Sequence, residues 1–274
     1  MASTLTFFSQ RRLINLGLLL SAVAAFWALQ ESYANGIRST GLLSGTALFG
    51  TCLVLALFNA RKKLPFIPLL KASTWTQFHI YAGWFAVVVF FFHTGLRMPN
   101  GLFEIALYSV FLAVALSGVL GLILSRIYPS RLRLYGENLM YERIPSLRQQ
   151  LQADVEKIIW KSVNETKSFT LARMYESKLK AYFSAKKNTF HHLIGSEKPV
   201  NDLTEELNQL QRYMVAAERV FLAEVIECVK AKDNLDMQAT CQGVLKYWLF
   251  IHIPLTFSLL LMGLLHGLMA LAFN

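Results

Sequence analysis

The sequence has few cysteines and little charge. Its three cysteines, Cys52, Cys228 and Cys241, form no CxxC or CxxCH pattern. This argues against covalent attachment of a c-type haem, a cysteine-ligated iron–sulfur cluster and a disulfide framework. Charged residues make up 16% of the 274 residues and hydrophobic residues 54%, whereas about a quarter of an ordinary soluble domain is charged. The composition therefore favours a membrane protein.

Nucleotide-binding fingerprints are also missing from the sequence. Neither GxGxxG nor GxxxxGK[ST] occurs, and these patterns are the usual signs of dinucleotide and nucleoside triphosphate sites. We therefore expect no flavin, NAD or ATP site in this chain.

Five apolar runs are long enough to predict membrane helices. They are Leu13–Leu29, Leu42–Phe58, Trp75–Gly95, Leu102–Leu124 and Val244–Phe273. The first run is also compatible with a signal peptide, since Arg11 and Arg12 precede it and the segment SYA at 32–34 resembles a cleavage site. We expect it to be retained as a membrane helix. Pro129 is expected to end the fourth helix.

Basic residues gather at one end of these helices. Only Arg38 and Arg97 fall on the opposite side of the predicted membrane. The basic end carries Arg11, Arg12, Arg61, Lys62, Lys63, Lys71, Arg126 and Lys246. The positive-inside rule then predicts a cytoplasmic N-terminus and an outer C-terminus, in a bacterial-type inner (plasma) membrane. Because topology accounts for most of the net charge of +10, we expect no nucleic-acid partner.

A polar stretch separates the fourth and fifth apolar runs. Residues 128–243 carry nearly balanced charge, and their apolar residues recur at three- and four-residue steps, which indicates amphipathic helices. The stripes are Leu147, Leu151, Val155 and Ile158; Leu171, Tyr175, Leu179 and Tyr182; and Leu203, Leu207, Leu210, Met214, Ala217, Phe221, Val225 and Cys228. The third stripe, from Leu203 to Cys228, predicts one long helix. We predict a cytoplasmic domain of three main helices between membrane segments 1–127 and 244–274.

Smaller features of this domain are predicted as well. The segment Gly195–Asn201, with Pro199, is the clearest break between its helices. His191 and His192 point about 100° apart on a helix, so they cannot share one ligand face, and we expect a solvated pair at a helix end. Cys228 and Cys241 are expected to be small buried residues.

Two of the apolar runs each contain a pair of histidines fourteen residues apart. They are His79 and His93, and His252 and His266. Fourteen residues are two heptads, so in supercoiled helices both side chains of a pair point from one stripe, about 21 Å apart along the axis. Four ligands in two distant layers cannot close around one zinc ion. Two imidazoles per layer, one from each helix, suit the six-coordinate iron of a b-type haem.

The two histidine helices are expected to run outward in parallel. His79 should then face His252 near the cytoplasm, and His93 should face His266 near the outer side, so that each pair holds one haem b. These features predict an all-α integral membrane protein with five transmembrane helices, a four-helix di-haem bundle and an inserted cytoplasmic helical domain. The alternative is that the histidines are unrelated and bonded to neighbouring backbone or hydroxyl groups.

Other residues at the inner helix ends have two interpretations. The basic ones either pair with haem propionates or are positive-inside residues without a ligand. They are Lys71, Arg126 and Lys246. Trp75 and Trp248, each four residues before a histidine, are explained as interfacial aromatic anchors.

The paired His-x13-His helices, separated by a histidine-free helix, resemble the di-haem core of cytochrome b from quinol:cytochrome c oxidoreductases. They are also similar to b561-like and ferric-reductase-like membrane cytochromes. The resemblance covers roughly residues 41–124 and 244–273. The chain departs from these families because it has no PEWY quinol-site sequence and no flavin or nicotinamide domain. Neither bc-type quinol oxidation nor autonomous NADPH-driven reduction is therefore implied.

The resemblance and the histidine geometry together imply one-electron transfer across the membrane. The expected partners are the lipid bilayer, a cytoplasmic iron–sulfur protein or flavoprotein, and a periplasmic cytochrome or the quinone pool. One alternative is a stand-alone quinone, superoxide or metal reductase, with Glu104 and Arg97 at a quinone pocket. The other is a haem-free scaffold or transporter, which would tolerate apolar replacement of His79 or His266.

Overall fold

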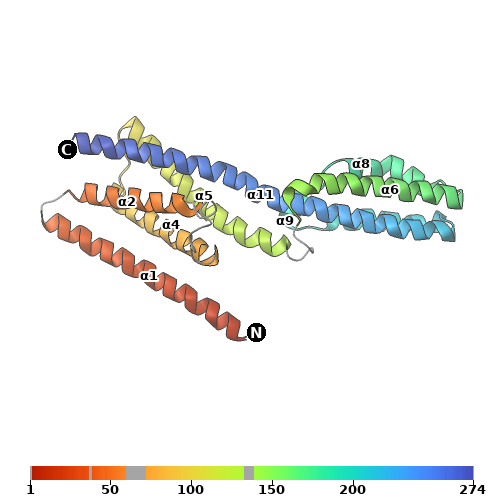
Figure 1. Cartoon of the computed structure of the whole chain (residues 1–274), viewed down its shortest axis with the longest axis horizontal. Coiled ribbons are helices and arrows are strands. Elements are labelled where there is room, and N and C mark those ends of the chain that lie inside the picture. Colours follow the sequence, from red (N-terminus) through yellow and green to blue (C-terminus); the bar gives the residue numbers. More distant parts are fainter. Residues whose placement is uncertain (1, 37–38, 60–71, 133–138, 274) are drawn as a thin grey trace, which may run out of the picture. The chain divides into compact units, whose positions relative to one another are not determined.

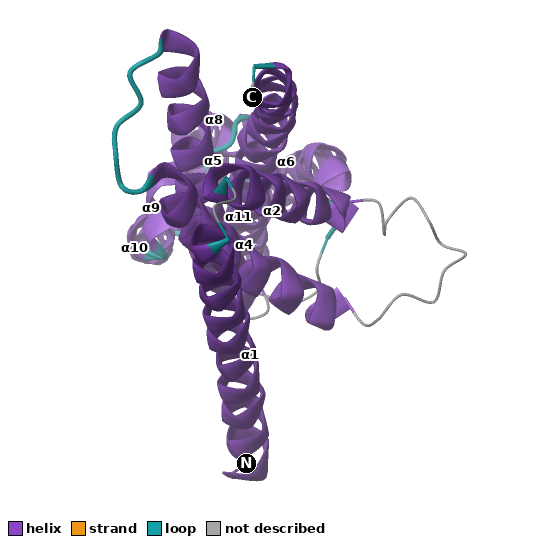
Figure 2. Cartoon of the chain, turned by 90° about the vertical axis from the view of Figure 1, so that its left-hand side faces the viewer, coloured by secondary structure: helices purple, strands orange, loops and turns teal. Residues whose placement is uncertain are grey.

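The computed structural model describes residues 2–36, 39–59, 72–132 and 139–273. Within these ranges every regular element is a helix, which confirms the predicted all-α class (Figure 2). The chain divides into two compact units. One comprises Met1–Leu122 with Trp248–Asn274, and the other comprises Ile123–Tyr247. We call the first the histidine unit, because it contains the four paired histidines, and the second the polar unit.

The histidine unit is built from long apolar helices (Figure 1). They are α1 (Ala2–Asn35), α2 (Thr40–Ala56) with a 3₁₀ turn at Leu57–Asn59, α4 (Ala72–Thr94), the first part of α5 (Leu102–Leu132) and the last part of α11 (Ala216–Ala272). A helix satisfies each of its backbone groups internally, which is the condition for placing an apolar segment in hydrocarbon. Long runs of Leu, Val and Phe therefore become helices here.

Several of these helices have the length and composition of membrane spans. Over the described ranges, α1, α4, α5 and α11 qualify, whereas α2 is apolar but only 17 residues long. Large apolar side chains such as Leu18, Leu116 and Phe257 are each more than 60% exposed. Soluble proteins rarely expose apolar surface this extensively. These features are those of a multi-pass membrane protein.

An apolar cluster joins both histidine helices to two others. Cys52 of α2, Phe90 of α4, Phe111 of α5 and Leu259 of α11 are buried together. The rings of Phe90 and Phe111 stack with centroids 4.0 Å apart. This packing holds α4 and α11 beside α2 and α5, which contain no histidine.

Helix α1 packs on α4. Phe26 of α1 is buried, with its ring centroid 6.0 Å from that of Phe85 and 5.9 Å from that of Phe92. Asn15 Nδ2 also donates a 3.0 Å hydrogen bond to Gln77 Oε1. The first apolar run is thus a packed helix in this structure.

The polar unit is a set of shorter helices around its own core. They are α6 (Ile144–Thr166), α7 (Thr170–Met174), a π-helical turn at Tyr175–Leu179, α8 (Lys180–Ser184), α9 (Thr189–Ile194) and α10 (Lys198–Gln209), with the adjoining parts of α5 and α11. The apolar stripes predicted from the sequence supply the core. Among its fully buried members are Val155, Leu179, Leu207 and Val225.

Two predicted limits of the membrane helices are wrong. Helix α5 passes Pro129 and ends at Leu132. The proline removes one hydrogen bond in the last turn, while Tyr128 and Leu132 on either side of it are buried against α11. The last helix begins at Ala216 rather than Val244. The sequence from Ala216 to Gln242 contains no Gly or Pro to end the amphipathic helix before the apolar run.

The prediction of one continuous helix over Leu203–Cys228 is also wrong, because this segment contains a break. Helix α10 ends at Gln209, a 3₁₀ turn follows at Leu210–Tyr213, and Met214 is extended before α11 begins. Both α10 and α11 face the same core, so the apolar period continues across the break. In addition, α10 already begins at Lys198, with Pro199 in its first turn, so the preceding break is shorter than predicted.

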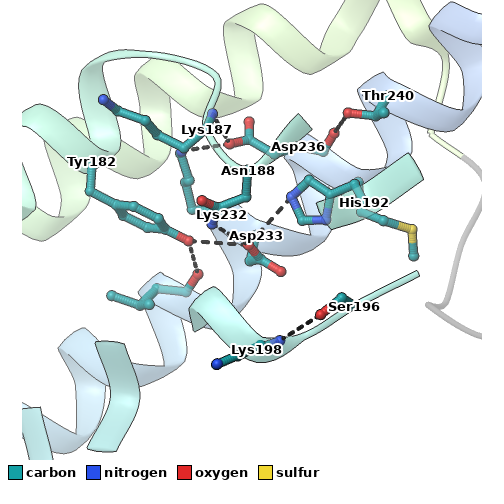
Figure 3. Close-up of polar contacts among 12 residues, drawn as sticks. Tyr182, Lys187, Asn188, His192, Ser196, Lys198, Lys232, Asp233, Asp236 and Thr240 are labelled. Carbon is teal, nitrogen blue, oxygen red and sulfur yellow. Dashed lines mark hydrogen bonds and ion pairs between the residues drawn. The ribbon is translucent and has the colours of Figure 1, made fainter. Parts of the chain in front are cut away.

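His192 corrects another prediction. The side chain is 4% exposed, and its Nε2 lies 3.4 Å from Asp233 Oδ1 (Figure 3). Burial lowers the pKa of His192, which favours the neutral ring. The histidine does lie near the end of a helix, α9, but its side chain is buried in the polar unit, whereas the adjacent His191, which points about 100° away, is half-buried. Cys241 is buried as predicted, whereas Cys228 is half-buried.

Beside His192 lies a buried ion pair (Figure 3). Lys232 is fully buried, and its Nζ donates to Asp236 Oδ2 at 2.5 Å and to the Ala185 carbonyl at 2.9 Å. Asp236 also accepts the Lys187 N–H at 2.9 Å and lies 3.1 Å from Arg148. Buried charges persist only when they are paired and hydrogen-bonded, as they are here.

Candidate functional site

The candidate site is formed by the histidines of α4 and α11. The rings of His93 and His266 have centroids 6.2 Å apart and planes at 86° to each other. Two imidazole nitrogens bound at about 2 Å on opposite sides of one metal ion place the ring centroids about 6 Å apart. The separation of these two rings is compatible with two ligands of one metal ion, and it is also within the range of an edge-to-face ring contact.

The other two histidines lie on the same two helices. His79 of α4 and His252 of α11 are near each other in the histidine unit. The ring of His79 lies against Phe58, with centroids 4.8 Å apart. The ring of His252 stacks on Trp248, with centroids 5.2 Å apart and an angle of 24° between the planes. The contact of His93 with His266 agrees with the pairing that the fourteen-residue spacing predicts for parallel helices, whereas the pairing of His79 with His252 stays a prediction.

Two serines on the neighbouring helices contact this site. Ser44 Oγ of α2 lies 3.0 Å from Nδ1 of His93, and Ser117 Oγ of α5 lies 3.1 Å from Nδ1 of His252. Neither serine was predicted from the sequence. Each serine directly precedes a glycine inside an apolar helix, so a hydroxyl group lies beside a residue that has no side chain. This Ser-Gly step is the sequence pattern that could have indicated both contacts.

The structure offers two tests of whether a haem fits these residues. A Cβ added at Gly45 would lie only 3.1 Å from Cε1 of His93, so glycine is what leaves room for the ring. In addition, a pair of imidazoles is the donor set of a b-type haem. The residues present fit the group.

A closed metal site of protein ligands is not found. Among the residues that the structure describes, no group of three or more His, Cys, Asp or Glu side chains gathers to hold a metal ion. The histidines instead occur as two pairs. This arrangement requires a cofactor with its own equatorial ligands if iron is to be six-coordinate.

The prediction that three basic residues face haem propionates is not tested by this structure. Lys71 lies outside the described residues. Arg126 and Lys246 belong to the polar unit rather than the histidine unit. There Lys246 Nζ lies 3.5 Å from Glu142 Oε1 and 4.6 Å from the centroid of the Tyr141 ring.

Trp248 has a more specific position than that of an interfacial anchor. Its Nε1 donates a 2.8 Å hydrogen bond to the carbonyl of Ser117 while its ring covers His252. Gly121, one turn after Ser117 on α5, makes room for the indole, because a Cβ added at Gly121 would overlap the indole ring. The indole therefore depends on glycine at this position.

We expect Gly121→Ala to destabilise the histidine unit by about 1–3 kcal/mol, the usual cost of overpacking. The indole must move, which disrupts its hydrogen bond to Ser117 and its stack on His252. Thermal unfolding in detergent, followed by tryptophan fluorescence, measures the effect. Gly83→Ala in α4 is the matched control, since a Cβ there meets no atom within 4 Å. Equal stability of the two variants would contradict this packing.

Comparisons of the chain with protein-family models, with curated proteins and with solved structures find no match.

Proposed function

We propose that this chain is a membrane-embedded di-haem b-type cytochrome subunit. In this proposal it carries electrons across the membrane between the quinone pool or a periplasmic cytochrome and a cytoplasmic redox partner. The observation that carries the proposal is the pairing of His93 with His266 at 6.2 Å. The second pair on the same two helices, fourteen residues away along each, supports it.

The residues of the chain have distinct roles in this proposal. His79 with His252 would hold one haem, and His93 with His266 would hold the other. Phe58 and Trp248 cover the rings of the first pair and limit the access of water, which is one of the means by which a protein sets a redox potential. When bound, haem b supplies a one-electron iron couple.

The proposed membrane topology has five spans. Helix α2, with 17 residues, is at the short end of the range that can cross a bilayer, and the 3₁₀ turn at Leu57–Asn59 extends it. With α2 counted as a span, basic residues fall mainly on one side, and we assign that side to the cytoplasm. The N-terminus and residues 128–243 are then cytoplasmic, and the C-terminus lies outside, in a bacterial-type inner membrane.

The partners follow from the proposed topology. The polar unit, on the cytoplasmic side, would dock an iron–sulfur protein or flavoprotein. The opposite side would meet a periplasmic cytochrome or the quinone pool. The absence of nucleotide fingerprints supports a donor or acceptor that resides on another chain.

The experiment that tests this function is a reduced-minus-oxidised visible spectrum of the purified full chain, combined with a haem-to-protein ratio. We expect two b haems per chain, low-spin in both oxidation states because both axial positions carry imidazole. Folded protein with no haem absorption would overturn the proposal. Turnover of quinone, superoxide or a metal complex by the isolated chain would instead favour a stand-alone reductase.

A further inference from the structure

A Ser-Gly step lies against one histidine of each pair. Ser44-Gly45 in α2 contacts His93, and Ser117-Gly118 in α5 contacts His252. In both cases the serine hydroxyl is at hydrogen-bond distance from Nδ1. A Cβ added at the glycine would lie 3.1 Å from Cε1 of His93 and 4.0 Å from Cε1 of His252. The same dipeptide thus contacts the same edge of the imidazole in two separate places.

We propose that Ser44 and Ser117 are positioning residues for metal binding at the histidine pairs. Each hydroxyl accepts a hydrogen bond from the Nδ1–H of its histidine and leaves Nε2 as the metal-binding nitrogen. This inference deepens the proposed function and rests on it for the identity of the bound group. The protonation and orientation of the rings are properties of the chain itself.

The hydroxyl of Ser44 is the more constrained of the two. Its Oγ lies 2.9 Å from the carbonyl of Thr40 and 3.2 Å from that of Gly41, in the preceding turn of α2. A hydroxyl has one hydrogen and two lone pairs. Since the hydrogen is directed to these carbonyls, Ser44 meets His93 as an acceptor. Nδ1 of His93 must then carry the proton, and the lone pair is on Nε2.

The side chain and the backbone of Ser117 both help to fix the position of His252. Its hydroxyl contacts Nδ1, and its carbonyl accepts the hydrogen bond from Nε1 of Trp248, whose indole stacks on the same imidazole. The ring is therefore fixed both at its edge and on one face. Binding of a metal by Nε2 requires a protonated Nδ1, for which the Ser117 hydroxyl is the acceptor.

A hydrogen-bond acceptor on Nδ1–H makes the imidazole a stronger electron donor and favours oxidised iron. Ser44→Ala is therefore expected to raise the midpoint potential of one haem, and Ser117→Ala that of the other. The expected size is about a tenfold change in the reduction equilibrium constant, or ~59 mV for one electron. Ser44→Thr and Ser117→Thr keep a γ-hydroxyl and should retain the wild-type potentials.

Matched controls are available on the same helices. Thr46 of α2 and Ser109 of α5 are exposed, and their hydroxyls bond only to carbonyls of their own helix. Thr46→Ala and Ser109→Ala should leave both potentials unchanged. If both serine-to-alanine variants also leave the potentials unchanged, the inference is wrong while the proposed function stands.

A second measurement does not depend on haem. Nitrogen-15 spectra of the full, histidine-labelled chain in lipid bilayers distinguish imidazole rings protonated at Nδ1 from those protonated at Nε2. We expect His93 to be protonated at Nδ1 in the haem-free wild type and this preference to weaken in Ser44→Ala. A wild-type His93 protonated at Nε2 would overturn the inference. If the chain takes up no haem at all, the proposed function fails and the nitrogen spectra still decide the tautomer.

Discussion

Replacement of His93 or His266 by leucine is expected to lower the haem content from two to about one per chain. Each change removes one of the two proposed haem ligands from the pair whose rings lie 6.2 Å apart, and a single remaining imidazole would not make the iron six-coordinate. The double variant His93→Leu/His266→Leu should lose no more haem than either single variant, since both changes affect the same site. Residues of one site are strongly non-additive.

For a double variant with one substitution in each pair, we expect the opposite result. His93→Leu/His252→Leu removes one ligand from each pair, so the haem content should fall close to zero. The haem-to-protein ratio and the reduced-minus-oxidised spectrum of each variant measure this. His191→Leu, in the polar unit, is the control and should retain two haems. Equal loss in all double variants, or a loss in His191→Leu, would mean that the pairs are not the ligands.

Asp236→Ala is expected to lower the free energy of unfolding of the polar unit by about 3–5 kcal/mol, the usual result of removing one partner from a buried ion pair. The reason is that the ammonium group of Lys232 stays buried. It keeps the Ala185 carbonyl and the Tyr182 ring, whose centroid is 4.0 Å away, but it loses the carboxylate to which it donates a hydrogen bond and keeps only the weaker attraction of Asp233. The Lys187 N–H loses its acceptor in the same step.

Urea titration of the full chain in detergent, read by pulse proteolysis within the polar unit, measures this loss. Glu227→Ala is the control, because Glu227 pairs with Lys230 on the exposed surface of the same helix. Exposed pairs contribute at most about 1 kcal/mol. The double variant Lys232→Met/Asp236→Leu removes both charges and should recover part of the lost stability. An Asp236→Ala chain as stable as the Glu227→Ala chain would show that the pair is not buried in the folded protein.

The histidine pairs were predictable because helix geometry fixes the direction of residues fourteen apart, whatever packs around them. The contacts of Ser44 and Ser117 were not, because they depend on how α2 and α5 are rotated toward α4 and α11. Rotation about a helix axis is set by interhelical packing, such as the stack of Phe90 on Phe111. In a helix that is apolar on all sides, no hydrophobic stripe reveals this rotation.

The helix boundaries show where local sequence signals compete with packing. Pro129 is a strong stop signal, but it lies inside α5, next to the buried Tyr128. The break between α10 and α11 has no Gly or Pro at all, because residues 210–215 read LQRYMV. The burial of His192 likewise depends on Asp233, which is 41 residues away in sequence and contributed by another helix. None of these outcomes can be predicted from a single short segment of the sequence.

Helix α11 also determines the order in which the protein can be completed during biosynthesis. Its first half supplies core residues such as Phe221 and Val225, and its second half supplies His252 and His266. At 5–20 residues per second, the ribosome adds the ~170 residues between His93 and His266 in roughly 10–35 s. The histidines of α4 are therefore in the nascent chain well before those of α11. Neither proposed pair can be completed until α11 has been translated, so a chain that stalls before residue 252 lacks the second histidine of both pairs.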